Sequence, residues 1–196
     1  MNPAVAGFVL AGGRSSRMGK EKALLAIDGE TLLARGLRQL GEVCAEVAIA
    51  GGTAELSRFG RLVPDEQTGQ GPLSGILAAL RSSACEWNLF CPVDVPFVPR
   101  CAWERMIAVA ADELHASADA ILARVCGQVQ PLCGLYRRRL EPELRTQLNH
   151  GERKVTRAVT DSGTVVWVDF DEQGQAAWFR NLNTPEDYAQ MMHPKL

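Results

Sequence analysis

The chain has 196 residues, of which 46% are hydrophobic, and its 21 basic and 23 acidic side chains leave a formal net charge of -2. A chain of this length buries most of its apolar surface in one core, and its balanced charge excludes a bulk field for nucleic acid or an anionic bilayer. No apolar run approaches the roughly 20 residues of a membrane span, and the first segment lacks an export-signal pattern. We therefore expect a cytoplasmic protein that binds neither nucleic acid nor membrane.

The first half of the chain alternates short apolar runs with helical patterns. Val5–Leu10 is a continuous apolar run, which predicts a strand buried on both faces. Apolar residues then recur at helical spacing over Thr31–Leu40, and the short run Val43–Ala50 predicts a second strand. Pro72 is placed where a helix begins, and Trp87–Val93 predicts another buried strand.

The second half continues the alternation. A helix is expected over Ala102–Leu114, strands over Ala120–Val125 and Val129–Tyr136, and helices over Leu140–Leu148 and Val155–Thr160. Strands and helices in this order predict a three-layer α/β/α fold with a doubly wound, mostly parallel, Rossmann-like sheet. Ligands of such folds bind beyond the carboxyl ends of the strands, so the informative residues should follow strands.

The cysteines show no spacing typical of a zinc or redox site. They lie in apolar surroundings, and we expect them to be buried thiols that behave as small hydrophobic side chains. The six are Cys44, Cys85, Cys91, Cys101, Cys126 and Cys133.

The segment Leu10–Lys22 has the composition of an anion-binding loop. It places three glycines and four cations directly after the first strand, where free amides and positive charge favour binding of an anion. It is not an ATPase P-loop, because five residues separate Gly13 from Gly19 and Glu21 follows Lys20. It is not a dinucleotide fingerprint either, because Gly12-Gly13 lacks the spacing.

These residues resemble the molybdenum cofactor guanylyltransferases, a MobA-like nucleotidyltransferase family that begins with Leu-Ala-Gly-Gly and continues through Arg-Met-Gly to a Lys. The resemblance runs from about Val5 to Tyr188 in the family's order. Its other matching segments are Gly71–Ile76, Pro92–Phe97, Pro131-Leu132, Gly151–Val155 and Asn181–Asp187.

The resemblance implies transfer of GMP from GTP to the terminal phosphate of molybdenum-bound molybdopterin, with Mg²⁺ as the metal and pyrophosphate as the leaving group. It implies a single domain over residues 1–196, with a nucleotide-binding half at about 1–115 and a pterin-binding half at about 116–196. GTP and molybdopterin are the expected small-molecule partners, and transient contact with other molybdenum-cofactor proteins and acceptor enzymes is expected.

The resemblance also implies roles for particular residues. Arg17, Lys22 and Asp94 are expected to be catalytic, and Asp94 is expected to hold the magnesium. Where relatives often have an Asn after the second strand, this chain has Ala50-Gly51-Gly52, so the Gly51 backbone is expected to replace that contact. The expected nucleotide-binding residues are Leu10, Ala11, Gly12, Gly13, Arg14, Lys22, Gly51, Asp65, Gly71 and Asp94, and the expected pterin contacts are Arg153, Asn181 and Asn183.

Several alternatives stay open from the residues alone. Asp65 and Asp94 are also typical turn residues, and Asn181 and Asn183 are equally suited to cap a helix near Pro185. The resemblance implies a guanylyl enzyme over a cytidylyl relative, because guanylyl members carry Gly-Gly where cytidylyl members carry Ala-Gly and this chain has Gly12-Gly13; a purine needs the space that a missing Cβ leaves. Another sugar-phosphate or methylerythritol nucleotidyltransferase, or a catalytically silent nucleotide-binding regulator on the same fold, is the remaining alternative.

Overall fold

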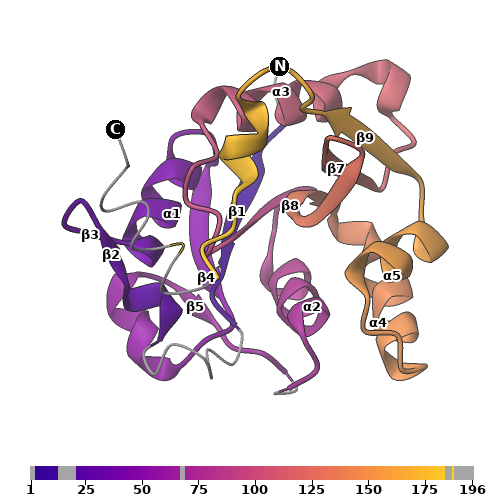
Figure 1. Cartoon of the computed structure of the whole chain (residues 1–196). Coiled ribbons are helices and arrows are strands. Elements are labelled where there is room, and N and C mark those ends of the chain that lie inside the picture. Colours follow the sequence, from indigo (N-terminus) through magenta and orange to yellow (C-terminus); the bar gives the residue numbers. More distant parts are fainter. Residues whose placement is uncertain (1–2, 13–20, 67–68, 184–186, 188–196) are drawn as a thin grey trace.

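The computed structural model describes residues 3–12, 21–66, 69–183 and 187. Within them a seven-stranded sheet has the strand order β5-β4-β1-β6-β8-β7-β9, and β2 and β3 form a separate hairpin (Figure 1). No helix in this part of the chain has the length and apolar character needed to cross a membrane. The strands are β1 (Val5–Leu10), β2 (Ala26–Ile27), β3 (Glu30–Thr31), β4 (Glu46–Ala50), β5 (Leu62–Val63), β6 (Trp87–Pro92), β7 (Ala120–Val125), β8 (Gln128–Arg137) and β9 (Val165–Asp169). The α-helices are α1 (Leu32–Gly41), α2 (Pro72–Ser82), α3 (Arg100–Ala111), α4 (Glu141–Asn149) and α5 (Val155–Ser162), and the 3₁₀ segments are η1 (Lys22–Leu24), η2 (Ala54–Phe59), η3 (Glu113–His115), η4 (Arg138–Leu140) and η5 (Gln175–Phe179).

Helices cover both faces of the sheet. α1 and α3 pack on one face, and α2, α4 and α5 pack on the other (Figure 1). Strand β1 shows the sequence reason: Val5 and Val9 enter the first core, whereas Ala6 and Phe8 enter the second. Because both of its faces are covered, all six residues of β1 are buried and the strand has no polar side. The predicted three-layer α/β/α fold is confirmed.

The sheet is mostly parallel, as predicted. β1 pairs in parallel with β4 and β6, β4 pairs in parallel with β5, and β7 pairs in parallel with β9. Strand β8 runs antiparallel to both of its neighbours, β6 and β7. The carboxyl ends of β1, β4, β5 and β6 therefore meet at one edge of the sheet, and the connections that leave these ends are the place to look for a ligand.

Some element boundaries differ from the prediction. Strand β4 begins at Glu46 rather than Val43, because the backbone N–H of Val43 donates to the Leu40 carbonyl and continues the turn that ends α1. Helix α3 ends at Ala111, because the next residue, Asp112, is extended and its carboxylate caps the N–H of Leu114 at 2.9 Å. The short strands β2, β3 and β5 and the edge strand β9 were not predicted from the sequence pattern.

The expectation of buried thiols is wrong for two cysteines. Cys91 and Cys133 are buried, but Cys101 and Cys126 are exposed. Cys101 lies in the first turn of α3, and Cys126 lies in the turn between β7 and β8 with a φ of 47°. An apolar sequence neighbourhood does not bury a side chain when the helix face or the turn directs it to solvent.

Candidate active site

Four of the predicted site segments meet at the carboxyl edge of the sheet. The N–H of Ala11 donates to the Ala50 carbonyl at 2.9 Å, which ties the end of β1 to the end of β4. The N–H of Val93 donates to the Leu10 carbonyl at 3.0 Å, and the N–H of Gly51 donates to the Val63 carbonyl at 2.9 Å. Backbone pairing thus continues past the strands and fixes the positions of the loops that follow them.

Glycines surround the carboxylate of Asp65, which follows β5. A Cβ added at Gly12 would lie 3.4 Å from Asp65 Oδ2, and one added at Gly51 or Gly75 would lie 3.2 Å from Oδ1. Gly51 also has a φ of 75°, and an added Cβ would lie 3.1 Å from the Gly12 Cα. Only glycine combines this backbone conformation with so close an approach of two loops and a carboxylate.

The Asp65 carboxylate lacks protein hydrogen-bond donors on one side. Its Oδ1 atom is buried and has no hydrogen-bond partner among the described residues. Burial raises the pKa of this carboxyl above its usual value, since desolvation disfavours the charged form. An unpaired buried acceptor costs stability, so this carboxylate is a candidate functional group rather than one kept for the fold.

The side chains of Lys22 and Asp94 meet at the same edge. Lys22 Nζ lies 2.9 Å from Asp94 Oδ2, and it also donates to Asn183 Oδ1 at 2.8 Å. Lys22 opens η1, and the preceding Glu21 accepts a hydrogen bond from the Thr53 hydroxyl at 3.1 Å. The structure therefore brings together two of the predicted catalytic residues, and it adds Asn183, which the sequence analysis had assigned to the pterin.

The donor set around Asp94 fits a magnesium ion. Among the described residues no cluster of three or more His, Cys, Asp or Glu side chains exists that would enclose a metal ion. Mg²⁺ commonly uses one or two protein carboxylates and takes its other ligands from water and substrate phosphates. A partly exposed carboxylate at the carboxyl end of β6, next to an ammonium group that suits a phosphate, is compatible with that mode of binding.

Helix α2 begins at this edge. Its N-cap, Gly71, has a φ of 78° and no side chain to cap the helix, and Pro72 occupies the first turn. One turn further on, Gly75 faces Asp65. The positive end of an 11-residue helix thus points towards the glycine-lined carboxylate, where it stabilises negative charge.

Pro72 also lines a cavity of about 520 Å³ between α2, β8 and α5. A β-bulge shapes one wall: Leu122 of β7 pairs with Gly134, the next residue pairs with Gln130, and the three β8 residues between them have no partner on β7. The hydroxyl of Tyr136 donates to the Pro131 carbonyl within this bulge. The wall is mostly apolar, and the opposite wall carries basic side chains; the lining residues are Pro72, Pro131, Leu132, Arg153, Lys154, Val155, Thr156, Arg157 and Thr160.

Of the predicted pterin contacts, Arg153 lines this cavity and donates through Nη1 to the Leu148 carbonyl at 2.9 Å. Asn181 is exposed, and its side chain makes no hydrogen bond within the described part of the chain. Asn183 contacts Lys22 instead of this cavity. Gly13, Arg14 and Arg17, and most of the expected helix near Pro185 that Asn181 and Asn183 are suited to cap, lie outside the described residues.

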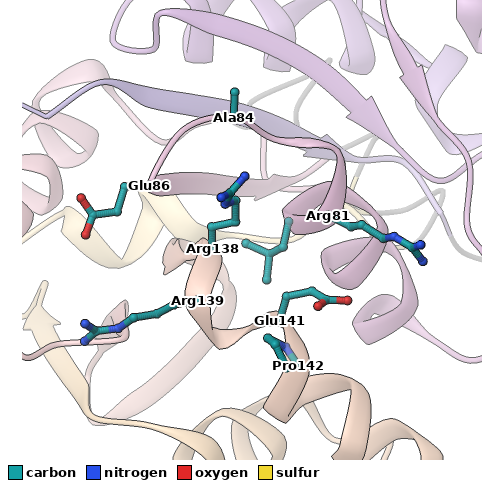
Figure 2. Close-up of a pocket in the computed structure, with 8 residues that line it drawn as sticks. Arg81, Ala84, Glu86, Arg138, Arg139, Glu141 and Pro142 are labelled. Atoms are coloured by element: carbon teal, nitrogen blue, oxygen red, sulfur yellow. The ribbon is translucent and has the colours of Figure 1, made fainter.

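A second cavity, of about 510 Å³, lies at the opposite edge of the sheet, beside the end of α2 and the start of β6. Figure 2 shows its three arginines, Arg81, Arg138 and Arg139, pointing in different directions. Each has a protein partner: Arg81 pairs with Glu66 at 3.1 Å, Arg139 pairs with Asp119 at 2.7 Å, and Arg138 donates to the Ser83 carbonyl. This cavity therefore offers no convergent charge for a ligand and is not the candidate site.

The fold and the edge site together define a three-layer α/β protein with a candidate ligand site at the carboxyl ends of its parallel strands. A family model described as the MobA-like NTP transferase domain matches residues 7–165, and the chain belongs to that family.

Curated relatives match nearly the whole chain. A probable molybdenum cofactor guanylyltransferase of Bacillus cytotoxicus is 29% identical over 196 residues, which is 96% of each chain. Another protein of that description, from Bacillus cereus, is 29% identical over 192 residues and 94% of each chain.

Solved structures share the fold. Molybdopterin-guanine dinucleotide biosynthesis protein A of Archaeoglobus fulgidus is similar with a TM-score of 0.79 at 22% identity, over 96% of this chain and 97% of that one. The 4-diphosphocytidyl-2C-methyl-D-erythritol synthase of Anaerococcus prevotii is similar with a TM-score of 0.74 at 12% identity, over 97% of this chain and 95% of that one. At these identities the likeness concerns the fold alone.

Proposed function

We propose that this protein transfers GMP from GTP to the terminal phosphate of molybdenum-bound molybdopterin and releases pyrophosphate. The observation that carries the proposal is the meeting of Lys22, Asp94, Asp65 and the glycines at one edge of the sheet. The curated relatives, which are described as molybdenum cofactor guanylyltransferases, support this choice of donor and acceptor.

The nucleotide is proposed to bind across the ends of β1, β4 and β5. Guanine presents two N–H donors along its pairing edge, and the Asp65 carboxylate is an acceptor group that matches them. Gly12 and Gly51 let the loops after β1 and β4 pack close to this carboxylate, and the base is proposed to approach it past Gly12; the N-terminus of α2 at Gly71 favours the negative charge of the phosphates. Leu10, Ala11, Gly13 and Arg14 complete the proposed nucleotide-binding set.

Phosphates and metal are proposed to lie between Lys22 and Asp94. Asp94 would hold Mg²⁺, which supplies charge to neutralise the triphosphate when it is bound. Lys22 and Arg17 would donate to phosphate oxygens and stabilise the charge that develops in the transition state. Removal of one such cation from a nucleotidyl-transfer site costs on the order of 3 kcal/mol, which is about 100-fold in rate.

The protein need not supply a nucleophile. A phosphate oxygen of molybdopterin forms a bond to the α-phosphorus of GTP, and the bond from that phosphorus to the oxygen bridging to the β-phosphate breaks, so that pyrophosphate leaves with the electron pair. What the chain contributes is the alignment of two anionic reactants, which would otherwise repel each other. We therefore expect cations on both sides of the reacting phosphorus.

The acceptor is proposed to occupy the cavity beside α5. Its apolar wall at Pro131 and Leu132 suits a flat ring, and Arg153 and Lys154 on the facing wall suit an anionic group. Asn181 remains a proposed pterin contact. We propose that residues up to about 115 form the nucleotide-binding half and that the residues after them form the pterin-binding half. Because the reaction consumes GTP, we propose that it takes place in the cytoplasm, with transient contact to other proteins of cofactor synthesis.

The test is mass analysis of the product formed by the purified protein with Mg²⁺, molybdopterin and either GTP or CTP. We expect addition of one GMP per pterin together with release of pyrophosphate. Addition of CMP instead would refute the choice of base, and release of pyrophosphate only with a different phosphorylated acceptor would refute the choice of acceptor. A protein that binds GTP tightly but transfers nothing would be a nucleotide-binding regulator on the same fold.

A further inference from the structure

The contact between Lys22 and Asn183 joins residues that are 161 positions apart in the chain. Lys22 Nζ donates to Asn183 Oδ1 at 2.8 Å and lies 2.9 Å from Asp94 Oδ2. An ammonium group has three N–H donors, and these two contacts direct two of them. Within the described part of the chain the third donor has no protein acceptor, so it is available to a ligand atom at the same edge of the sheet.

The backbone N–H groups of Leu182 and Asn183 hold this segment at the site. The side chain of Leu182 is buried, and its N–H donates to the Asp94 carbonyl at 2.8 Å. The N–H of Asn183 itself donates to Asp187 Oδ2 at 3.0 Å. The position of the Asn183 amide is therefore set relative to Asp94 by backbone bonds, and not only by its contact with the lysine.

The neutrality of Asn183 matters when charge enters the site. An ion held by Asp94 would compete with Lys22 for the carboxylate and would repel the ammonium group. The Asn183 oxygen is uncharged, so it neither attracts the metal strongly nor repels the phosphates, and it continues to hold the lysine. A carboxylate at this position would add a negative charge next to the triphosphate.

We propose that Asn183 is a positioning residue for Lys22, which keeps the ammonium group directed at the phosphates while Asp94 is shared with the metal. This inference rests on the proposed function and differs from the pterin contact that the sequence implied for Asn183. The two interpretations make different predictions, because a positioning residue acts only through Lys22, whereas a pterin contact acts on the acceptor.

The test is a double-mutant cycle of the full chain with Asn183→Ala, Lys22→Met and both together. In each protein, kcat and the KM for molybdopterin are measured, and the Kd of GTP with Mg²⁺ is measured by calorimetry. Asn183→Ala should lower kcat roughly tenfold, the effect of losing one hydrogen bond to a charged group, and leave the KM for molybdopterin within about twofold. In the Lys22→Met background the same substitution should change kcat and Kd less than about twofold.

An equal loss from Asn183→Ala in both backgrounds, a change confined to the KM for molybdopterin, or no loss at all would overturn the proposal. Gln173→Ala is the matched control, because it removes an exposed amide from the same part of the chain, and it should match the wild type in every measurement. A wild type that transfers no GMP would refute the proposed function alone, since the cycle in the Kd of GTP would still report whether Lys22 and Asn183 are coupled.

Discussion

Replacement of Gly12 by alanine tests whether the nucleotide approaches the Asp65 carboxylate past Gly12. The added Cβ would lie 3.4 Å from Asp65 Oδ2 and 3.7 Å from the Gly51 Cα, which are ordinary van der Waals contacts. The fold should therefore tolerate the methyl group. The methyl group would, however, occupy the approach to the carboxylate, and loss of one hydrogen bond to a charged group costs about 1.5–3 kcal/mol. We expect the Kd of GTP to rise about 10- to 100-fold.

The assay is calorimetric titration of each protein with GTP and with CTP in Mg²⁺, together with thermal denaturation. Gly41→Ala is the matched control, since it adds the same methyl group at the end of α1 with no atom within 4 Å. It should leave the Kd of GTP unchanged and stabilise the fold by about 0.4–1 kcal/mol. If Gly12→Ala binds GTP as tightly as the wild type, the nucleotide does not approach Asp65 past Gly12.

Three further predictions concern Asp65, Gly134 and Asp94. Because the folded-state pKa of Asp65 is raised, the native state loses stability as pH rises from the usual aspartate pKa through the raised value. Asp65→Asn should therefore have a higher Tm than wild type at neutral pH, with the difference vanishing in acid, while its Kd for GTP rises; a pH-independent difference in Tm would contradict this. Gly134→Ala would place a Cβ 2.7 Å from the Ile121 carbonyl oxygen, and it should cost about 1–3 kcal/mol in denaturant unfolding, whereas an unchanged midpoint would show that β7 and β8 separate easily. Asp94→Asn should fold normally but lower GMP transfer by about 100-fold or more at saturating Mg²⁺, and full turnover would exclude its proposed metal role.

The order of the elements could be predicted from the sequence because it depends on local patterns. A fully apolar run such as Val5–Leu10 is stable only as a strand covered on both faces, and such strands separated by amphipathic helices favour a parallel sheet. Asp94 was placed at a ligand-binding edge for the same reason, since it follows the predicted strand that became β6, whereas Asp65 was assigned by the family resemblance because β5 was not predicted.

The hydrophobic pattern of the sequence did not predict the features that depend on pairing between strands. Two-residue strands such as β2, β3 and β5 are too short to show the alternation of apolar and polar residues that identifies a strand. Strand β9 is defined by its pairing with β7. The antiparallel direction of β8 and its bulge at Pro131 likewise depend on the neighbouring strands, whose identity the period of one segment does not specify.

For the site, the sequence by itself determined which residues were available: a glycine- and cation-rich segment after one buried strand, the carboxylate of Asp94 after another, and that of Asp65. Only the tertiary structure decided how they are paired. It left the Asp65 oxygen without a donor and placed Asn183 on Lys22. The physical reason is that a side chain's chemistry is fixed by its type, whereas its partner is chosen by contacts between residues far apart in the chain, which become close only when the sheet has formed.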